Sequence, residues 1–240
     1  MKVLIACEES QAVCTAFRKL GHEAFSCDLQ ECSGGHPEWH IMGDVLPLIN
    51  GNCEFDTADG KHHAIDGKWD MLIAHPPCTY LTNVATRHYS LKCTPAEKVI
   101  DRMEHREEAI VFFMQCMLAD APRIAVENPV GRMGKVFRKA DQIIHPYMFS
   151  GGAADTEQFV TKATCLWLKG LPKLQATYIG DKPDNAKLFG TYANGKSRTW
   201  EEIQRSGKNR SKVRSKTFPG IAQAMAEQWG GIPDENKKMP

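Results

Sequence analysis

Short apolar runs and one amphipathic segment alternate over the first 28 residues of the chain. Residues 2–7 and 23–27 are mostly apolar runs of strand length, which predicts two buried strands. Between them, apolar residues recur at helical spacing over residues 11–20, and Gly21 follows as a helix stop. A strand, a helix and a strand in this order predict the opening βαβ unit of a parallel sheet.

Two later apolar runs each end at a proline turn that carries a chemically useful side chain. Residues 69–74 lead into a double proline, which cannot continue a sheet ladder, so Cys78 is predicted on the loop that follows. Residues 123–126 form the second apolar run, which is followed by Glu127 and then by Asn128 and Pro129. Taken alone, a cysteine after such a turn is most often a small buried residue. Because ligands bind beyond the carboxyl ends of parallel strands, however, Cys78 and Glu127 are predicted to face one crevice.

The rest of the chain adds helices and strands around this crevice. Pro95 begins a strongly helical run whose apolar residues recur at the spacing of a core-facing helix. Composition and periodicity assign the other segments as follows: an exposed polar insertion at 50–68, a loop over the site at 79–92, strands at 141–149 and 163–168, and an apolar helix at 221–229. We therefore expect an α/β fold with a doubly wound, mostly parallel sheet.

Length and composition favour one cytoplasmic domain with a small appendage. The chain has 240 residues, no long apolar span, and an N-terminus that reaches the acidic pair Glu8-Glu9 too early for a secretory signal. We therefore expect no membrane segment. The nine cysteines are odd in number and irregularly spaced, which is typical of reduced thiols rather than of a disulfide framework.

Positive charge is concentrated toward the C-terminus. The formal net charge is only +1, yet residues 182–216 hold ten Lys or Arg against three Asp or Glu, a local charge of +7. Such segregation indicates either a surface for a polyanion or a solvated basic loop. Trp200 and two nearby tyrosines are available for stacking on bases. The predicted organisation is a core at 1–168, a short basic insertion at 169–214, a helix at 215–230 packing back on the core, and a tail at 231–240.

Asp28 ends the second predicted strand, the position where nucleotide-binding sheets place a carboxylate for ribose hydroxyls. The first turn lacks the Gly-x-Gly-x-x-Gly fingerprint and has Cys-Glu-Glu-Ser at residues 7–10, whose carboxylates would repel a diphosphate. This repulsion does not apply to a cofactor without phosphates, such as S-adenosylmethionine. Asp44 is either a second cofactor contact or the cap of a following turn.

Zinc-ligand residue types occur in one segment, at Cys27, Cys32, His36 and His40. Only three residues separate the cysteine pair from the histidine pair, far fewer than in a zinc finger, so no metal site is predicted. A zinc deaminase would need a second cysteine where Leu81 stands.

The order of these motifs resembles that of the DNA cytosine-5 methyltransferases. A strand ending in Pro-Pro-Cys, a later strand ending in Glu-Asn, an acidic residue at the end of the second strand and a Gly-Asp pair between them carry the resemblance. The chain is also similar to compact members of this superfamily encoded by bacteriophages and prophages, from Met1 to Trp229. The resemblance implies a Rossmann-like fold of the S-adenosylmethionine-dependent methyltransferase type, acting on DNA in a bacterial cytoplasm.

The resemblance also implies roles for individual residues. Cys78 would be the nucleophile, Glu127 would protonate or hydrogen-bond the base, and Asn128 would hold that turn. The implied cofactor-binding residues are Cys7, Glu8, Asp28 at the ribose, Asp44 at the adenine edge, Pro76 and Thr217. The candidate contacts to double- or single-stranded DNA are Arg87, His88, Lys162, Arg198, Lys208 and Arg210.

These residue types suit the chemistry of cytosine C5, which is a poor nucleophile by itself. A thiolate adds to C6 and makes C5 enamine-like, while a carboxyl group at N3 offsets the developing negative charge. Methyl transfer and loss of the C5 proton then free the cysteine by elimination. In a duplex the target base would first be flipped out of the stack.

The chain departs from the family pattern at three points. It lacks the glycine-rich first turn, Thr79 stands where a glutamine usually follows the cysteine, and the Arg-rich later motif is reduced to Lys162. Two alternatives stay open: a DNA-binding protein that keeps the fold without turnover, and a thymidylate-synthase-like enzyme acting at C5 of a free pyrimidine nucleotide. The amino-methyltransferases place an aromatic residue where Cys78 stands, so carbon methylation is favoured.

Overall fold

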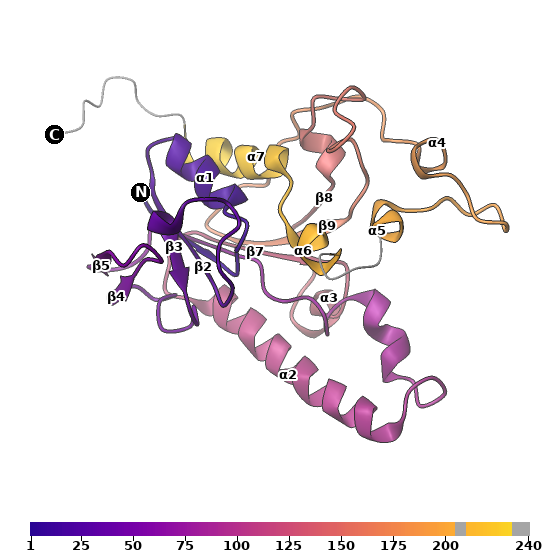
Figure 1. The fold of residues 1–240 in the computed structure, drawn as a ribbon, viewed down its shortest axis with the longest axis horizontal. Helices are drawn as coiled ribbons and strands as arrows, with labels where there is room; N and C mark the ends of the chain where they lie inside the picture. Colours follow the sequence, from indigo (N-terminus) through magenta and orange to yellow (C-terminus); the bar gives the residue numbers. More distant parts are fainter. Residues whose placement is uncertain (205–209, 232–240) are drawn as a thin grey trace.

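A seven-stranded sheet forms the centre of the molecule, which the computed structural model describes over residues 1–204 and 210–231. Its strand order is β3-β2-β1-β6-β7-β9-β8, and β4 and β5 form a separate two-stranded sheet (Figure 1). The strands are β1 (Lys2–Ala6), β2 (Glu23–Asp28), β3 (His40–Met42), β4 (Cys53–Asp56), β5 (His62–Ile65), β6 (Met71–Ala74), β7 (Ile124–Pro129), β8 (Gln142–Ile144) and β9 (Thr164–Lys169).

Five neighbouring strands of the large sheet are parallel, from β3 through β2, β1 and β6 to β7. The strand β9 runs antiparallel to both β7 and β8. The strand order reverses between β1 and β6, and open sheets bind ligands at such a switch point, outside the carboxyl ends of the strands. The predicted α/β class with a mostly parallel sheet is confirmed, and the sheet is compatible with a Rossmann-like fold.

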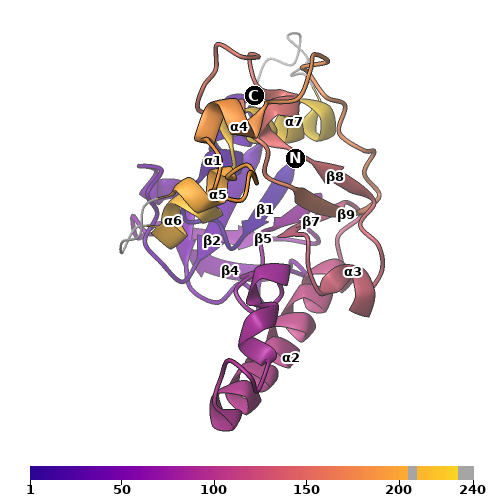
Figure 2. The same cartoon turned by 90° about the vertical axis from the view of Figure 1, so that its right-hand side faces the viewer.

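Helices cover both faces of the sheet. α1 and α7 lie side by side on one face, and α2 crosses the other (Figure 1). The first half of α2 and the short helix η2 project away from the sheet, as Figure 2 also shows. The helices are α1 (Ala12–Lys19), α2 (Ala96–Leu118), α3 (Met133–Val136), α4 (Asn185–Phe189), α5 (Trp200–Ile203), α6 (Arg210–Ser215) and α7 (Pro219–Gly230), with 3₁₀ helices η1 (Pro37–Trp39), η2 (Asn83–Tyr89) and η3 (Pro146–Phe149).

Alternate residues of the central strands feed two apolar cores. Val3 and Ile5 of β1 pack with α1 and α7, in a cluster that includes Phe17. Leu4 points to the opposite face and belongs to the cluster that holds Phe113 of α2. Burial on both faces is what a parallel sheet requires, and it explains why these strands are continuous apolar runs rather than alternating ones.

The predicted elements are mostly present, with three corrections. The helix predicted at 11–20 spans 12–19 and is confirmed. The segment 50–68 is more than an exposed insertion, because it contains the β4–β5 hairpin and its Phe55 packs near Trp69 in the core. The loop predicted at 79–92 contains η2. The strand predicted at 141–149 holds only for 142–144, since a proline starts η3 soon after.

The structure also bears on membrane-spanning helices and on disulfides. Within residues 1–204 and 210–231, no helix combines the length and apolar character that crossing a bilayer requires. None of the nine cysteines is in a disulfide.

Candidate functional site

The site lies at the carboxyl end of β6, where its parallel pairing with β7 ends. The two strands pair in parallel with Ala74 opposite Val126, so the residues that follow, His75 and Glu127, are neighbours. The Nδ1 atom of His75 lies 3.2 Å from Oε2 of Glu127. Both side chains are largely buried, with exposed fractions of 8% for His75 and 20% for Glu127. The structure therefore places a buried histidine–carboxylate pair within hydrogen-bond distance at the carboxyl edge of the sheet.

A second contact ties the Pro-Pro turn to β7. The side-chain amide of Asn128 donates a hydrogen bond from Nδ2 to the carbonyl oxygen of Pro76, at 2.9 Å. Asn128 is buried, and within the described part of the chain its Oδ1 has no hydrogen-bond partner. This bond fixes the turn that carries Cys78 against the strand that carries Glu127. Pro76, predicted at the cofactor, thus has a structural contact through its carbonyl.

Backbone hydrogen bonds and a β-bridge hold the loop after Cys78 in place. The backbone N–H groups of Leu81 and Thr82 both donate to the carbonyl of Cys78. Thr82 forms a β-bridge with Gly131, where the two loops pass so closely that any side chain at residue 131 would collide with the Leu81 carbonyl. The loop that carries Cys78 and the strand that carries Glu127 are therefore held in one framework.

The charges at the site are coupled. Burial raises the pKa of the Cys78 thiol, and the nearby Glu127 carboxylate raises it further, while Lys162 acts in the opposite direction. Burial would also raise the pKa of Glu127, but the hydrogen bond and charge of His75, with Lys162, bring it below its usual value. For His75, burial lowers the pKa, but Glu127 and then Glu8 outweigh it, and the net pKa is raised. The resting site at neutral pH thus holds a thiol beside an ionised carboxylate.

Lys162 connects this site to the segment that precedes α7. Its Nζ donates to the Arg214 carbonyl at 2.8 Å and lies 5.8 Å and 5.7 Å from the ring centroids of Trp200 and Phe218. A pocket opens between these elements. Its lining residues are Glu127, Lys162, Thr164, Ser215, Lys216, Thr217, Phe218, Ile221 and Met225. The structure thus brings the predicted cofactor residue Thr217 and the predicted DNA contact Lys162 to the same pocket as Glu127.

The carboxylate of Glu8, predicted at the cofactor, caps α1. It accepts hydrogen bonds from the backbone N–H groups of Val13 at 2.6 Å and Cys14 at 3.1 Å. Burial raises the pKa of Glu8, although the charge of His75 and the two backbone bonds lower it in part. Glu8 occupies the backbone N–H groups that a helix N-terminus would offer to a phosphate, so they are not available to bind a diphosphate.

The turn between β1 and α1 replaces the missing glycine-rich loop with a packed structure. Cys7 and Gln11 have positive φ angles of 59° and 57°. The side chain of Gln11 exchanges two hydrogen bonds with the backbone of His36. Gly34 packs so closely on Gln11 that a side chain there would collide. Burial raises the pKa of the Cys7 thiol, with further contributions from Cys116 of α2 and then Asp28, and Cys7 packs against the core cluster that contains Cys116.

Asp28 combines a carboxylate with exposed apolar surface. Its Oδ1 accepts a bond from the Gln30 backbone at 2.9 Å. Leu29 is 77% exposed, and Met42, which pairs with Asp28 across β2 and β3, is 59% exposed. A carboxylate beside exposed apolar side chains suits a nucleoside, which offers hydroxyl donors and an apolar ring face. Asp44 is exposed, and its carboxylate accepts from the Leu46 backbone, so it does cap a local turn.

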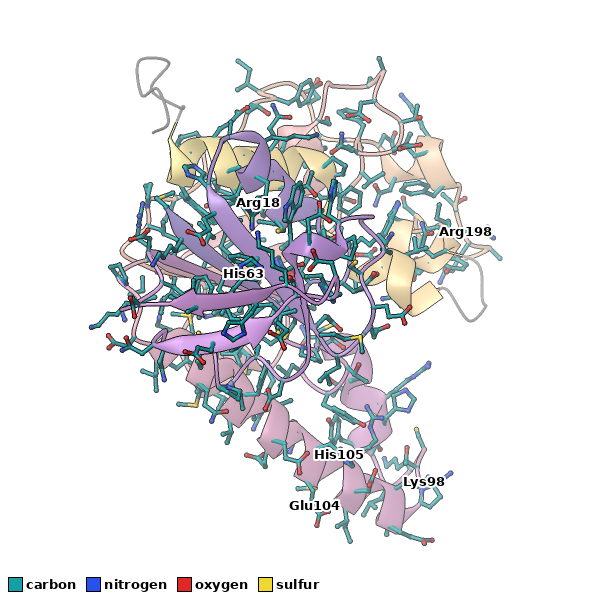
Figure 3. The ribbon with its side chains drawn as sticks, turned by 60° about the vertical axis from the view of Figure 1, so that its left-hand side comes forward. Arg18, His63, Lys98, Glu104, His105 and Arg198 are labelled. Atoms are coloured by element: carbon teal, nitrogen blue, oxygen red, sulfur yellow. The ribbon has the colours of Figure 1, made fainter. Side chains whose placement is uncertain are left out.

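The predicted DNA contacts fall in two separate places. Arg87 and His88 lie on η2, and Arg87 Nε contacts His88 Nε2 at 3.2 Å. Arg198 is exposed and stacks over Tyr192 just before α5, away from the first turns of α2, which Lys98 marks in Figure 3. Arg210 begins α6, the helix whose Arg214 carbonyl accepts the bond from Lys162, and Lys208 lies outside the described residues.

The structure adds two functional candidates that the sequence patterns do not mark. The first is His75, whose partner Glu127 is 52 residues away in the chain, so nothing local marks the pair. The second is the apolar pair Leu29 and Met42, and an exposed leucine directly after Asp28 was the available signal. The described residues contain no group of three His, Cys, Asp or Glu able to hold a metal ion. His40, once considered for zinc, bonds instead to Ser26 and the Gln30 carbonyl.

Comparison with known proteins adds no identification. No protein-family model matches the chain, and no curated protein matches it. Function is therefore inferred from the site itself.

Proposed function

We propose that this protein methylates cytosine at C5 in DNA, with S-adenosylmethionine as the methyl donor. One observation carries the proposal: the Cys78 loop and Glu127 lie where the parallel pairing of β6 and β7 ends, and the bond from Asn128 to Pro76 ties the loop to β7. A nucleophile and an acid–base group in one rigid framework meet the requirement for covalent catalysis on a pyrimidine ring. The resemblance of the strand-end motifs to cytosine-5 methyltransferases points the same way.

In this mechanism Cys78 attacks C6 of the base and Glu127 acts at N3. The thiol first loses its proton, the sulfur–C6 bond forms, and the ring electron pair released toward N3 is neutralised by a proton. S-adenosylmethionine, when bound, supplies an electrophilic methyl group to the activated C5. Asn128 keeps the two reacting side chains in register through its bond to Pro76.

The residues at the ends of β2 and β3 fit such a donor. Asp28 offers one carboxylate for ribose hydroxyls, and Leu29 and Met42 offer apolar surface to an adenine ring. Capping of α1 by Glu8 removes the donors that a diphosphate would need, which favours a phosphate-free nucleoside over a dinucleotide. These residues would hold the donor beside the switch point of the sheet.

The DNA partner is supported by charge. The segment 182–216 carries a local charge of +7, and Lys162 joins its end to the pocket that holds Glu127. A polyanion bound along this segment would run past the ends of the strands, where a flipped base could reach Cys78.

The proposal is tested by trapping the covalent intermediate. Protein is incubated with S-adenosylmethionine and an oligonucleotide that contains 5-fluorocytosine, and its intact mass is measured for wild type and Cys78→Ser. Fluorine at C5 blocks elimination, so wild type should stay attached to the DNA while Cys78→Ser stays free. If wild type binds DNA but forms no adduct on single- or double-stranded DNA of varied sequence, the protein is instead a DNA-binding protein without turnover. An adduct with free fluorinated nucleotide alone would favour a thymidylate-synthase-like reaction.

A further inference from the structure

His75 is a buried group at the site that the mechanism above leaves without a role. It directly follows β6 and directly precedes the Pro-Pro turn, so its backbone is fixed by the sheet and by the bond from Asn128 to Pro76. Its Nδ1 lies 3.2 Å from Oε2 of Glu127. Its Nε2 is buried and has no hydrogen-bond partner in the described part of the chain. Among residues 1–204 and 210–231, the Glu127 carboxylate is thus the one hydrogen-bond partner of this ring.

Charged groups face His75 from each neighbouring strand end. Glu127 approaches from β7, Glu8 from the turn after β1, and Lys162 from the residues before β9, with the Cys78 thiol on its own loop. The two carboxylates and the single lysine leave a net negative surrounding, in which a protonated imidazole is favoured. A buried carboxylate without a cation would take up a proton, so His75, the cation in direct contact, is the main group that can keep Glu127 ionised, and Lys162 adds a smaller effect.

We infer that His75 is a positioning residue that holds Glu127 as a carboxylate in the resting protein, so that Glu127 carries the thiol proton of Cys78 to N3 of the base. The inference rests on the proposed function. Glu127 then acts first as a base, toward the Cys78 thiol, and second as an acid, toward N3 of the base. A carboxyl group that was already protonated at rest would supply N3 but could not accept the thiol proton.

The step balances without a proton from solvent. The S–H bond of Cys78 breaks, its proton passes to Glu127, and the thiolate forms the bond to C6. The C5–C6 π electrons shift toward C4, those of the C4–N3 bond become a lone pair on N3, and the Glu127 proton joins it. Glu127 is then again a carboxylate beside protonated His75. On elimination after methyl transfer, the C5 proton is lost to solvent water, C5=C6 re-forms as the sulfur–C6 bond breaks, and the proton on N3 returns through Glu127 to the Cys78 thiolate.

The first arm of the test needs neither DNA nor methyl donor. Protein labelled at its histidine rings is studied by NMR, and the His75 signals are identified by their loss in His75→Gln. In wild type the His75 ring should be an imidazolium near neutral pH, and in Glu127→Gln the same ring should be neutral. A neutral His75 in the wild-type protein overturns the inference, whatever the enzyme turns out to do.

The second arm measures the rate of adduct formation with 5-fluorocytosine DNA as a function of pH. Glutamine at residue 75 can still donate a hydrogen bond but carries no charge, so Glu127 should become protonated at rest. His75→Gln should therefore react at least about tenfold more slowly near neutral pH and regain rate as the pH rises. His62→Gln is the matched control, because His62 is exposed on the β4–β5 hairpin and bonds to Asp56.

The two arms separate the possible failures. If wild type forms no adduct, the proposed function fails, while the NMR arm still reports on the ion pair. If wild type and His75→Gln form adduct at equal rates with the same pH profile, the proposed function stands and the inference about His75 is overturned.

Discussion

Two largely buried carboxylates, Glu8 after β1 and Glu127 in β7, belong to the strands on either side of β6 and differ in what their oxygens contact. Glu8 accepts two backbone N–H groups of α1, and burial leaves its pKa raised. Glu127 has a charged partner, His75, and its pKa is lowered despite burial. Two neutral donors and the charge of a more distant His75 thus do not offset burial at Glu8, whereas direct contact with His75 does so at Glu127. We therefore assign a structural role to Glu8 and a chemical role to Glu127.

The largest expected effect comes from removing the chemical carboxylate. Glu127→Gln keeps the size and one hydrogen-bonding oxygen but can neither accept nor deliver a proton. Methylation of cytosine-containing DNA should fall by about 10²–10⁴-fold, the usual range for loss of a general acid–base group. The measurement is transfer of labelled methyl groups to DNA at saturating donor. A loss below about tenfold would make Glu127 a structural residue like Glu8.

Removal of the structural carboxylate should act on stability instead. Glu8→Ala leaves the buried N–H groups of Val13 and Cys14 without their acceptors, at a cost of about 1–3 kcal/mol in the free energy of unfolding. Denaturant unfolding measures this cost. Glu8→Gln is the matched control, since it retains one acceptor oxygen and should lose less. A fully stable Glu8→Ala protein that does not methylate would reverse the assignment of the two carboxylates.

The pH dependence of stability sharpens the same comparison, because the two pKa values shift in opposite directions. The raised pKa of Glu8 means that the folded state holds its proton more tightly, so its contribution to stability declines as the pH rises above the unfolded value of about 4.3. The contribution of Glu127 is present above that value and is lost as the pH falls through its lowered folded pKa.

Thermal melts at a series of pH values test these signs. On acidification, the stability gap between wild type and Glu127→Gln should close, whereas the gap between wild type and Glu8→Gln should open in favour of wild type. Parallel changes in the two gaps would show that the carboxylates share one kind of environment.

The sequence predicts the site best where local rules decide the outcome. A double proline ends a strand whatever the rest of the chain does, and parallel strands always bring their carboxyl ends to one edge. These two rules are sufficient to place Cys78 and Glu127 together. Charge and hydrogen-bond partners across the sheet obey no such rule. His75 gains its role from a residue 52 positions away, and no pattern within β6 marks it.

The first turn shows the other limit of the sequence reasoning. Its acidic residues were expected to repel a diphosphate by their charge alone. In the structure Glu8 acts differently, because it occupies the backbone donors of α1. The same residues therefore disfavour a diphosphate through a hydrogen-bond arrangement that depends on the positive φ angles of Cys7 and Gln11. Backbone conformations of this kind are rare for residues other than glycine, so the sequence gives no sign of them.

The smallest effects should come from the carboxylates that are not buried, and they extend the comparison to the cofactor. Asp28→Asn removes a charge beside Leu29 and Met42, and should weaken binding of S-adenosylmethionine about tenfold, the value of one charged hydrogen bond. Asp44→Asn should change binding by less than about threefold, because an asparagine oxygen can still accept from the Leu46 backbone. Isothermal titration calorimetry without DNA measures both. Equal losses would mean that Asp44 contacts the cofactor directly, and no loss for either variant would move the donor site away from the ends of β2 and β3.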